Sequence, residues 1–173
     1  PVTLWRKTCI AAARLGGEVL KRYRGKVTAR EKQPKDLVTE ADLESQRVIE
    51  EFLRQRFPTH RILGEESIGV AEVAETNGDQ VRWIIDPLDG TTNFVHGFPS
   101  YCVTVAVERG GTVWAGAVYD PVADECFHAG RGEGAAIDSS LSVSTPLATS
   151  RCRSLDQALL AAGFSAQVTP GSI

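Results

Sequence analysis

The sequence predicts an α+β fold, in which two amphipathic helices come first and a series of short strands follows. Three observations support this prediction: a helical apolar repeat over residues 5–23, a capped helix that begins near Thr39, and alternating strand patterns between 101 and 128. With 173 residues, 42% of them hydrophobic, the chain is long enough to bury one substantial core. We therefore expect a single domain.

The two helices are predicted from the spacing of apolar residues. In the first, apolar or small residues recur at alternating steps of four and three: Trp5, Cys9, Ala12, Gly16, Val19 and Tyr23. The second begins after Thr39, which with Asp42 three residues later forms a capping-box pattern. Its apolar stripe is Val48, Ile49, Phe52 and Leu53, and Pro58 lies beyond its end.

The strands are predicted from short apolar or alternating runs. Residues 61–63 and 83–85 are apolar runs of strand length, and residues 101–107 alternate a bulky face with a small face made of Cys102, Thr104 and Ala106. A glycine turn at 109–111 leads into a second strand over 112–119, so this pair is expected to form an antiparallel hairpin. A further strand is expected near 126–128. The glycine-rich run 130–134 lacks the helix of a dinucleotide-binding fingerprint and indicates hairpin turns.

The segment from Trp83 to Phe94 carries the clearest chemical signal. Its apolar strand ends in Asp86, and Pro87 is expected to break the strand ladder so that Asp89 faces the same pocket. Gly90 permits close backbone approach to a ligand, and a short helix starting near Thr91 would offer free N–H groups to phosphate. Carboxylates at this spacing suit Mg²⁺, which prefers oxygen ligands. The alternative is an ordinary Asp-Pro-x-Asp-Gly turn.

Two further acidic segments lie upstream. Glu65 and Glu66 follow the short strand at 61–63, where a solvated surface pair is the alternative interpretation. Asp42 lies at the start of the second helix, where capping alone would explain it.

Together these segments resemble the inositol monophosphatase family of Mg²⁺-dependent, lithium-sensitive phosphatases. The resemblance rests on DLVTEAD at 36–42, GEES at 64–67 and WIIDPLDGTTNFVHGFP at 83–99. It implies a layered α/β sandwich, with a largely antiparallel sheet flanked by two long helices. It also implies hydrolysis of a phosphate monoester, most simply inositol monophosphate, by a metal-activated water. Fructose 1,6-bisphosphate, histidinol phosphate, a nucleotide 3′-phosphate or NADP are alternative substrates, and a non-catalytic regulatory protein on the same fold is the alternative function.

The resemblance also implies the roles of individual residues. A first Mg²⁺ would be held by Glu65, Asp86 and the carbonyl of Leu88, and Asp86 and Asp89 would share a second metal. Thr91, oriented by Asp42, would help to activate the attacking water, so Asp42, Glu65 and Thr91 are the candidate catalytic residues. The backbone N–H groups of Gly90 and Thr91 would hold phosphate, and Asp89 would also contact a substrate hydroxyl. Glu66 would have a supporting role, and Lys32 or Lys35 would supply a nearby positive charge.

The resemblance covers the amino-terminal part of the family pattern. The family's further aspartate, in a Trp-Asp motif of a carboxy-terminal lobe, has no counterpart here, because the tryptophans stand at 5, 83 and 114 and none precedes Asp. Residues 159–164 resemble the strand that enters that second lobe. We therefore expect residues 1–173 to form the metal- and phosphate-binding amino-terminal lobe, without the carboxy-terminal lobe, and to be inactive alone.

Composition constrains the partners. The chain has 19 basic and 22 acidic residues, a net charge of −3, and no basic run typical of nucleic-acid binding. A carboxylate-rich pocket repels a phosphate ester unless cations lie between them, so the activity should depend strictly on metal. We expect a small phosphate ester as the partner, no membrane and no direct nucleic-acid contact, and, from the resemblance, a homodimer. The four cysteines are widely spaced without a CxxC, which favours reduced thiols in the cytoplasm.

Overall fold

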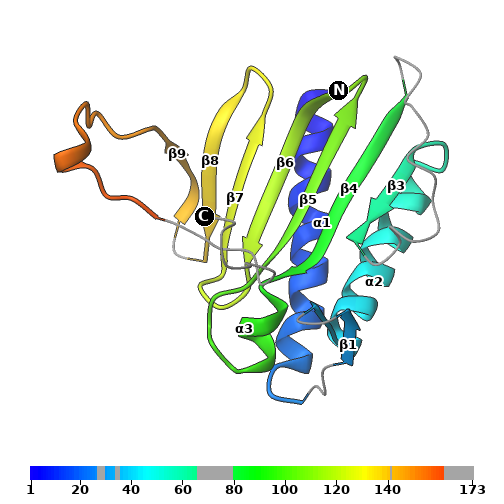
Figure 1. The fold of residues 1–173 in the computed structure, drawn as a ribbon. Coiled ribbons are helices and arrows are strands. Elements are labelled where there is room, and N and C mark those ends of the chain that lie inside the picture. Colours follow the sequence, from blue (N-terminus) through cyan, green and yellow to red (C-terminus); the bar gives the residue numbers. More distant parts are fainter. Residues whose placement is uncertain (27–29, 34–35, 66–79, 141, 162–173) are drawn as a thin grey trace.

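A computed structural model describes residues 1–26, 30–33, 36–65, 80–140 and 142–161, and its centre is a seven-stranded sheet (Figure 1). The strand order is β3-β4-β5-β6-β7-β8-β9, in which β3 and β4 are parallel and every other pair is antiparallel. The strands are β3 (Arg61–Gly64), β4 (Val81–Asp89), β5 (Cys102–Arg109), β6 (Thr112–Asp120), β7 (Glu125–Gly130), β8 (Gly134–Ser139) and β9 (Ser142–Leu147). A separate hairpin pairs β1 (Arg30–Gln33) with β2 (Asp36–Val38). The expected α+β class with a largely antiparallel sheet is confirmed.

The first helix, α1 (Val2–Tyr23), packs across β5, β6 and β7. Its buried side includes five of the six residues that the sequence repeat predicted, and Tyr23 is half-buried. Gly16 and Gly17 allow close packing, because a Cβ on Gly17 would lie 2.3 Å from the Tyr119 ring on β6. The two glycines therefore let the helix lie directly on the sheet and on the second helix.

The second helix, α2 (Glu40–Arg56), packs on β4 and on α1. Thr39 is its N-cap and Asp42 completes the predicted capping box. Ile49 and Leu53 are fully buried in the core that the two helices share with the sheet. The cap fixes where the helix begins, and so places the Asp42 carboxylate near the end of β4.

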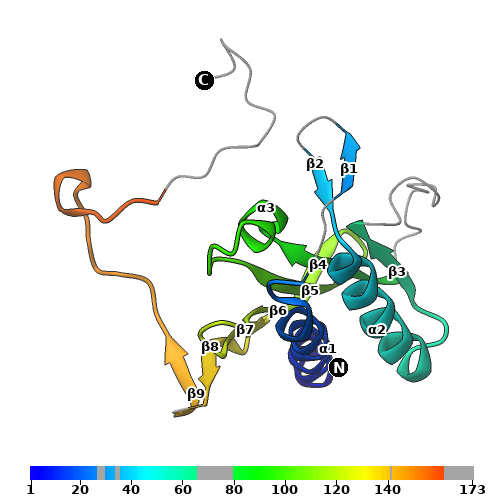
Figure 2. The same ribbon diagram turned by 90° about the horizontal axis from the view of Figure 1, so that it is seen from below.

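The two faces of the sheet differ in their cover. Figure 2 shows α1 and α2 together on one face, against which Val103, Val105 and Val107 are completely buried. On the opposite face, apolar side chains of β6, β7 and β9 are exposed, with exposed fractions of 37% for Val118, 38% for Phe127 and 42% for Leu147. The two long helices thus flank one face of the sheet, and the other face carries an apolar surface.

Strand β4 differs from the prediction at its end. The sequence indicated that it would stop at Asp86 with Pro87 breaking the ladder, but the strand continues to Asp89. Its pairing with β5 is irregular between Asp86 and Asp89, where the register shifts. Proline can be accommodated at such an irregularity because a residue there is left out of the ladder. The prediction that the strand ends at Asp86 was therefore wrong, whereas the break in the ladder at Pro87 and the short helix α3 (Thr91–Val95) are present as expected.

The carboxy-terminal part of the chain was predicted less well. Strands β8 and β9 were not predicted, and residues 159–161, expected to begin a strand, are outside any helix or strand. Beyond β9 the described chain leaves the sheet and forms only a 3₁₀ turn at Leu155–Gln157 (Figure 1). Residues 162–164 lie outside the described residues. Among those described, no helix is long and apolar enough to cross a membrane.

Candidate active site at the end of strand β4

The candidate site begins with a buried carboxylate at the start of α2. Asp42 is only 1% exposed, and its Oδ2 accepts hydrogen bonds from the Thr39 backbone N–H at 2.9 Å and the Thr39 hydroxyl at 2.5 Å. Its Oδ1 accepts from the Thr91 hydroxyl at 3.1 Å. Burial raises the pKa of Asp42, and these hydrogen bonds oppose the rise. Asp42 therefore joins the cap of α2 to α3, and both the capping role and the predicted contact with Thr91 are present.

The irregular end of β4 is held by hydrogen bonds to its own backbone and to α2. The Leu88 N–H donates to Asp86 Oδ1 at 3.2 Å, and the Ser45 hydroxyl of α2 donates to the Pro87 carbonyl at 2.9 Å in a buried position. Leu88 itself is buried, at 1% exposure, and its carbonyl accepts from the Thr91 hydroxyl at 3.0 Å. These contacts fix the direction of Asp86 and of the Leu88 carbonyl.

Gly90 makes the turn from β4 into α3. Its φ of 92° lies in the left-handed region, which L-residues with a Cβ rarely adopt. A Cβ at this position would also lie 2.9 Å from the Ser100 carbonyl oxygen. Glycine is therefore required for two reasons, its backbone conformation and the lack of space for a Cβ. The turn places Thr91 next to Asp42.

Beside this turn, Asp86 is influenced by two other carboxylates, Glu65 and Asp89. The pKa of Asp86 is raised to about 7, first by burial, then by the charges of Glu65 and Asp89, and by a hydrogen bond between the Asp86 and Glu65 carboxyl groups. The N–H of Leu88 lowers it, and none of these influences comes from a cationic side chain of the described residues. A divalent cation would supply the positive charge that this group of carboxylates needs, so the residues fit Mg²⁺.

The carboxylates do not form a closed metal cage. Within the described residues, no three His, Cys, Asp or Glu side chains lie close enough together to hold a metal ion by themselves. Asp86 is half-buried, whereas Glu65 and Asp89 are exposed. This open arrangement suits a cation that keeps water or substrate on part of its coordination sphere.

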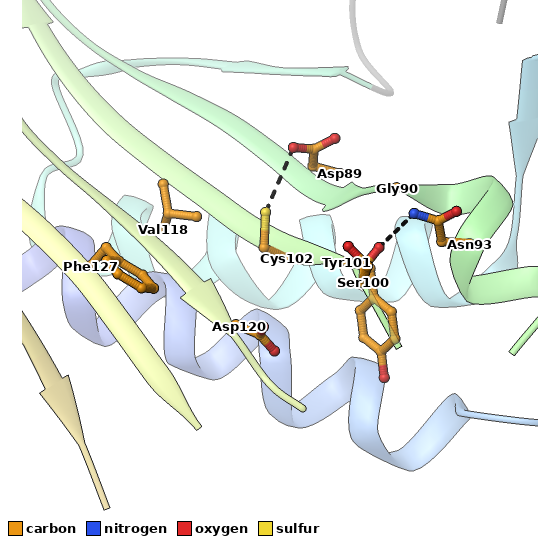
Figure 3. Close-up of a pocket in the computed structure, with 9 residues that line it drawn as sticks. All are labelled: Asp89, Gly90, Asn93, Ser100, Tyr101, Cys102, Val118, Asp120 and Phe127. Carbon is orange, nitrogen blue, oxygen red and sulfur yellow. Dashed lines mark hydrogen bonds between the residues drawn. The ribbon is translucent and has the colours of Figure 1, made fainter. Parts of the chain in front are cut away.

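A pocket of about 340 Å³ adjoins Asp89 on the open face of the sheet (Figure 3). It is lined by Asp89, Gly90, Asn93, Ser100, Tyr101, Cys102, Val118, Asp120 and Phe127. The Cys102 Sγ lies 3.6 Å from Asp89 Oδ2, and Asn93 Nδ2 donates to the Ser100 carbonyl at 2.7 Å. The pocket combines carboxylate and amide groups with an aromatic ring, which suits a small polar ligand with one apolar side.

The structure thus brings the predicted residues to one end of the sheet. The pairs Asp42–Thr91, Glu65–Asp86 and Asp86–Asp89 interact directly or electrostatically. The sequence interpretation did not assign Ser45 or Cys102 to the site. Cys102 belongs to the small face of the 101–107 strand, which was the available signal, whereas nothing in the sequence marked Ser45. Glu66 and Lys35 lie outside the described residues, as does the side chain of Lys32.

The fold and the positions of the predicted residues agree with the family that the sequence motifs resemble. The sequence profile of the Inositol monophosphatase family matches residues 3–171. The chain therefore belongs to this family, as the resemblance of its motifs implied.

Two curated relatives illustrate the range of names in the family. Nus factor SuhB of Pseudomonas aeruginosa is 41% identical over 158 residues, which cover 90% of this chain and 56% of that protein. Inositol monophosphatase of Mesembryanthemum crystallinum is 39% identical over 136 residues, covering 78% of this chain and 50% of that protein. The chain thus spans about half the length of these relatives.

Solved structures agree with the fold. The extragenic suppressor protein suhB of Bartonella henselae aligns with a TM-score of 0.69 and 37% identity, over 76% of this chain and 51% of that one. A crystal structure described as an IMPase/NADP phosphatase with Mg²⁺ and phosphate aligns with a TM-score of 0.60 and 32% identity, over 70% of this chain and 45% of that one. Both alignments support the α+β sandwich fold.

Proposed function

We propose that this chain is the metal- and phosphate-binding lobe of a Mg²⁺-dependent phosphomonoesterase. The observation that carries the proposal is the half-buried Asp86 beside the charges of Glu65 and Asp89: burial first, and then these charges, raise its pKa to about 7. Carboxylates placed in this way destabilise the folded protein unless a cation binds there, because like charges beside a half-buried position repel one another. A related structure with Mg²⁺ and phosphate gives the same chemistry as a precedent.

A first metal would be held by Glu65, Asp86 and the Leu88 carbonyl, and a second by Asp86 and Asp89. When bound, Mg²⁺ would neutralise these carboxylates, attract the phosphate group and lower the pKa of a coordinated water. The rigid hydrogen bonds to Asp86 and to the Pro87 carbonyl keep this end of β4 in one position. The protein would therefore meet the ion with little rearrangement of its backbone.

The attacking water would be oriented by Thr91. Its hydroxyl lies within hydrogen-bonding distance of Asp42 Oδ1 and of the Leu88 carbonyl, so Asp42 holds the hydroxyl at a fixed place. A buried carboxylate with a raised pKa is also a suitable acceptor for a proton passed through that hydroxyl. The backbone N–H groups of Gly90 and Thr91 would hold the phosphate, and Asp89 would contact a substrate hydroxyl.

The proposed substrate is inositol monophosphate, which several named relatives support. The test is phosphate release by the complete protein from inositol 1-phosphate, fructose 1,6-bisphosphate, histidinol phosphate, a nucleotide 3′-phosphate and NADP. We expect release to require millimolar Mg²⁺, to be fastest with inositol 1-phosphate, and to be inhibited by Li⁺. Faster phosphate release from another ester would support the proposed phosphatase reaction and show that inositol 1-phosphate is not the preferred substrate.

The division into lobes is also a proposal. The chain spans about half of its relatives, and one face of its sheet is apolar and uncovered by its own helices. A second lobe packed on that face would complete the substrate site beside Asp89.

A second candidate function is a regulatory role on the same fold. It is favoured by the relative named Nus factor SuhB, at 41% identity. The two functions differ in their need for the carboxylates. Metal binding by the complete protein without turnover of any ester in the panel would favour the regulatory role.

A further inference from the structure

Strand β5 places two small polar side chains directly beside the candidate metal ligands of β4. In the pairing of these strands, Asp86 is opposite Thr104 and Asp89 is opposite Cys102. Opposite residues in an antiparallel pair project to the same face of the sheet. All four side chains therefore lie on the open face, away from α1 and α2.

This arrangement depends on the irregularity in β4. Asp86 and Asp89 are three residues apart, a spacing that in a regular strand would direct them to opposite faces. Their partners on β5 are only two residues apart, so β4 contains one extra residue, as in a β-bulge. The same irregularity that brings the Asp86 and Asp89 carboxylates to one face also places the Cys102 thiol next to Asp89.

The Cys102 side chain contacts both Asp89 and Thr104. Its thiol donates to Asp89 Oδ2 over 3.6 Å. Figure 3 marks this hydrogen bond with a dashed line. The Thr104 side chain forms a hydrogen bond with the same thiol. Because Thr104 restrains the sulfur, the thiol can restrain the direction of the otherwise exposed Asp89 carboxylate.

We propose that Cys102 is a positioning residue for Asp89, which sets how well that carboxylate is oriented for the metal. This inference rests on the proposed function. A thiol is a weak donor, so it can direct one carboxylate oxygen without cancelling the negative charge that a cation requires. Groups that form hydrogen bonds to a metal ligand, without contacting the metal, typically contribute a factor of about 10–100 to metal affinity.

The test is Mn²⁺ binding to the complete protein, measured from the electron paramagnetic resonance signal of the free ion, which does not depend on turnover. Cys102→Ala should raise the Mn²⁺ dissociation constant by about tenfold, because the donor is lost. Cys102→Ser keeps a donor of similar size and should bind within about threefold of the wild type. Thr104→Val removes the hydroxyl that restrains the sulfur at nearly constant shape, and should also weaken binding.

The matched control is Cys152→Ala, which removes an exposed thiol beyond β9 and should leave binding unchanged. The thermal unfolding temperature without metal should be the same for the wild type and Cys102→Ala, which separates orientation of Asp89 from a general loss of stability. Unchanged Mn²⁺ affinity in Cys102→Ala would overturn this inference and leave the proposed function intact. Absence of Mn²⁺ binding in the wild type would overturn the proposed function, and this inference with it.

Discussion

The carboxyl group of Asp86 shows how one residue links stability to function in this protein. Its pKa of about 7 lies above the value for an unfolded aspartate because burial and the neighbouring acids favour the protonated form. The folded metal-free protein therefore holds a proton that the unfolded chain has already lost between about pH 4 and pH 7. Stability from this group is fully present below that window and is lost as the pH rises through it.

The first prediction follows from this linkage. The free energy of unfolding of the metal-free protein should fall between about pH 4 and pH 7, with Asp86 contributing about 1–2 kcal/mol of the fall after allowance for solvent screening. Asp86→Asn cannot ionise, so it should remove most of the pH dependence and be more stable than the wild type at pH 8. Urea unfolding in the presence of a chelator measures both. Parallel pH profiles for the two proteins would contradict the assigned cause.

Asp42 gives a second prediction at the same scale. Asp42→Ala removes the acceptor for both Thr39 donors and for the Thr91 hydroxyl. Loss of the reciprocal hydrogen bond of the capping box, together with buried unpaired donors, should cost about 2–3 kcal/mol of unfolding free energy. Thr91→Val is the matched control, since it removes only the hydroxyl and should cost about 1 kcal/mol. Equal stability of Asp42→Ala and the wild type in urea would show that Asp42 has no structural role.

At the scale of elements, the contact of α1 with the sheet depends on glycine. A Cβ on Gly17 would lie 2.3 and 2.4 Å from two atoms of the Tyr119 ring. That ring is 1% exposed, and its hydroxyl donates to Asp124 and accepts from Lys21, so it cannot move aside easily. With a Cβ at this position, α1 and β6 would have to move apart.

Gly17→Ala should therefore destabilise the protein, although alanine is the better helix former. Overpacking costs about 1–3 kcal/mol, and the gain in helix propensity offsets about 1 kcal/mol of it. Leu4→Ala, at an exposed position of the same helix, should change stability by less than about 0.5 kcal/mol. A Gly17→Ala protein that melts above the wild type would show that the helix is less closely packed than described.

The elements also show what a sequence can reveal. Both long helices were predictable because their apolar repeats and the Thr39 cap are local signals. The continuation of β4 through Pro87 was not, since its register depends on β5, a strand that follows later in the chain. The position of Cys102 next to Asp89 depends on the same register. The acidic residues of the site were identified from motifs, whereas the residues that hold them in place come from other elements.

At the scale of the whole molecule, one face of the sheet should behave as an interface. Val118, Phe127 and Leu147 form an exposed apolar surface on β6, β7 and β9. Residues 1–173 alone should bind the dye ANS, which reports exposed apolar surface, and Phe127→Ser should weaken the signal. In the complete protein the signal should be absent. Strong dye binding by both forms would contradict a second lobe on this face.

The central claim is that the carboxylates at the end of β4 bind the metal that a phosphatase needs. The most direct test compares phosphate release from inositol 1-phosphate by the complete wild-type protein and by Asp86→Asn, across a range of Mg²⁺ concentrations. Loss of one central metal-binding charge should lower kcat by at least about 10³-fold at any Mg²⁺ concentration, while the variant remains folded. Near-normal Mg²⁺-dependent turnover in folded Asp86→Asn would contradict the metal site described here.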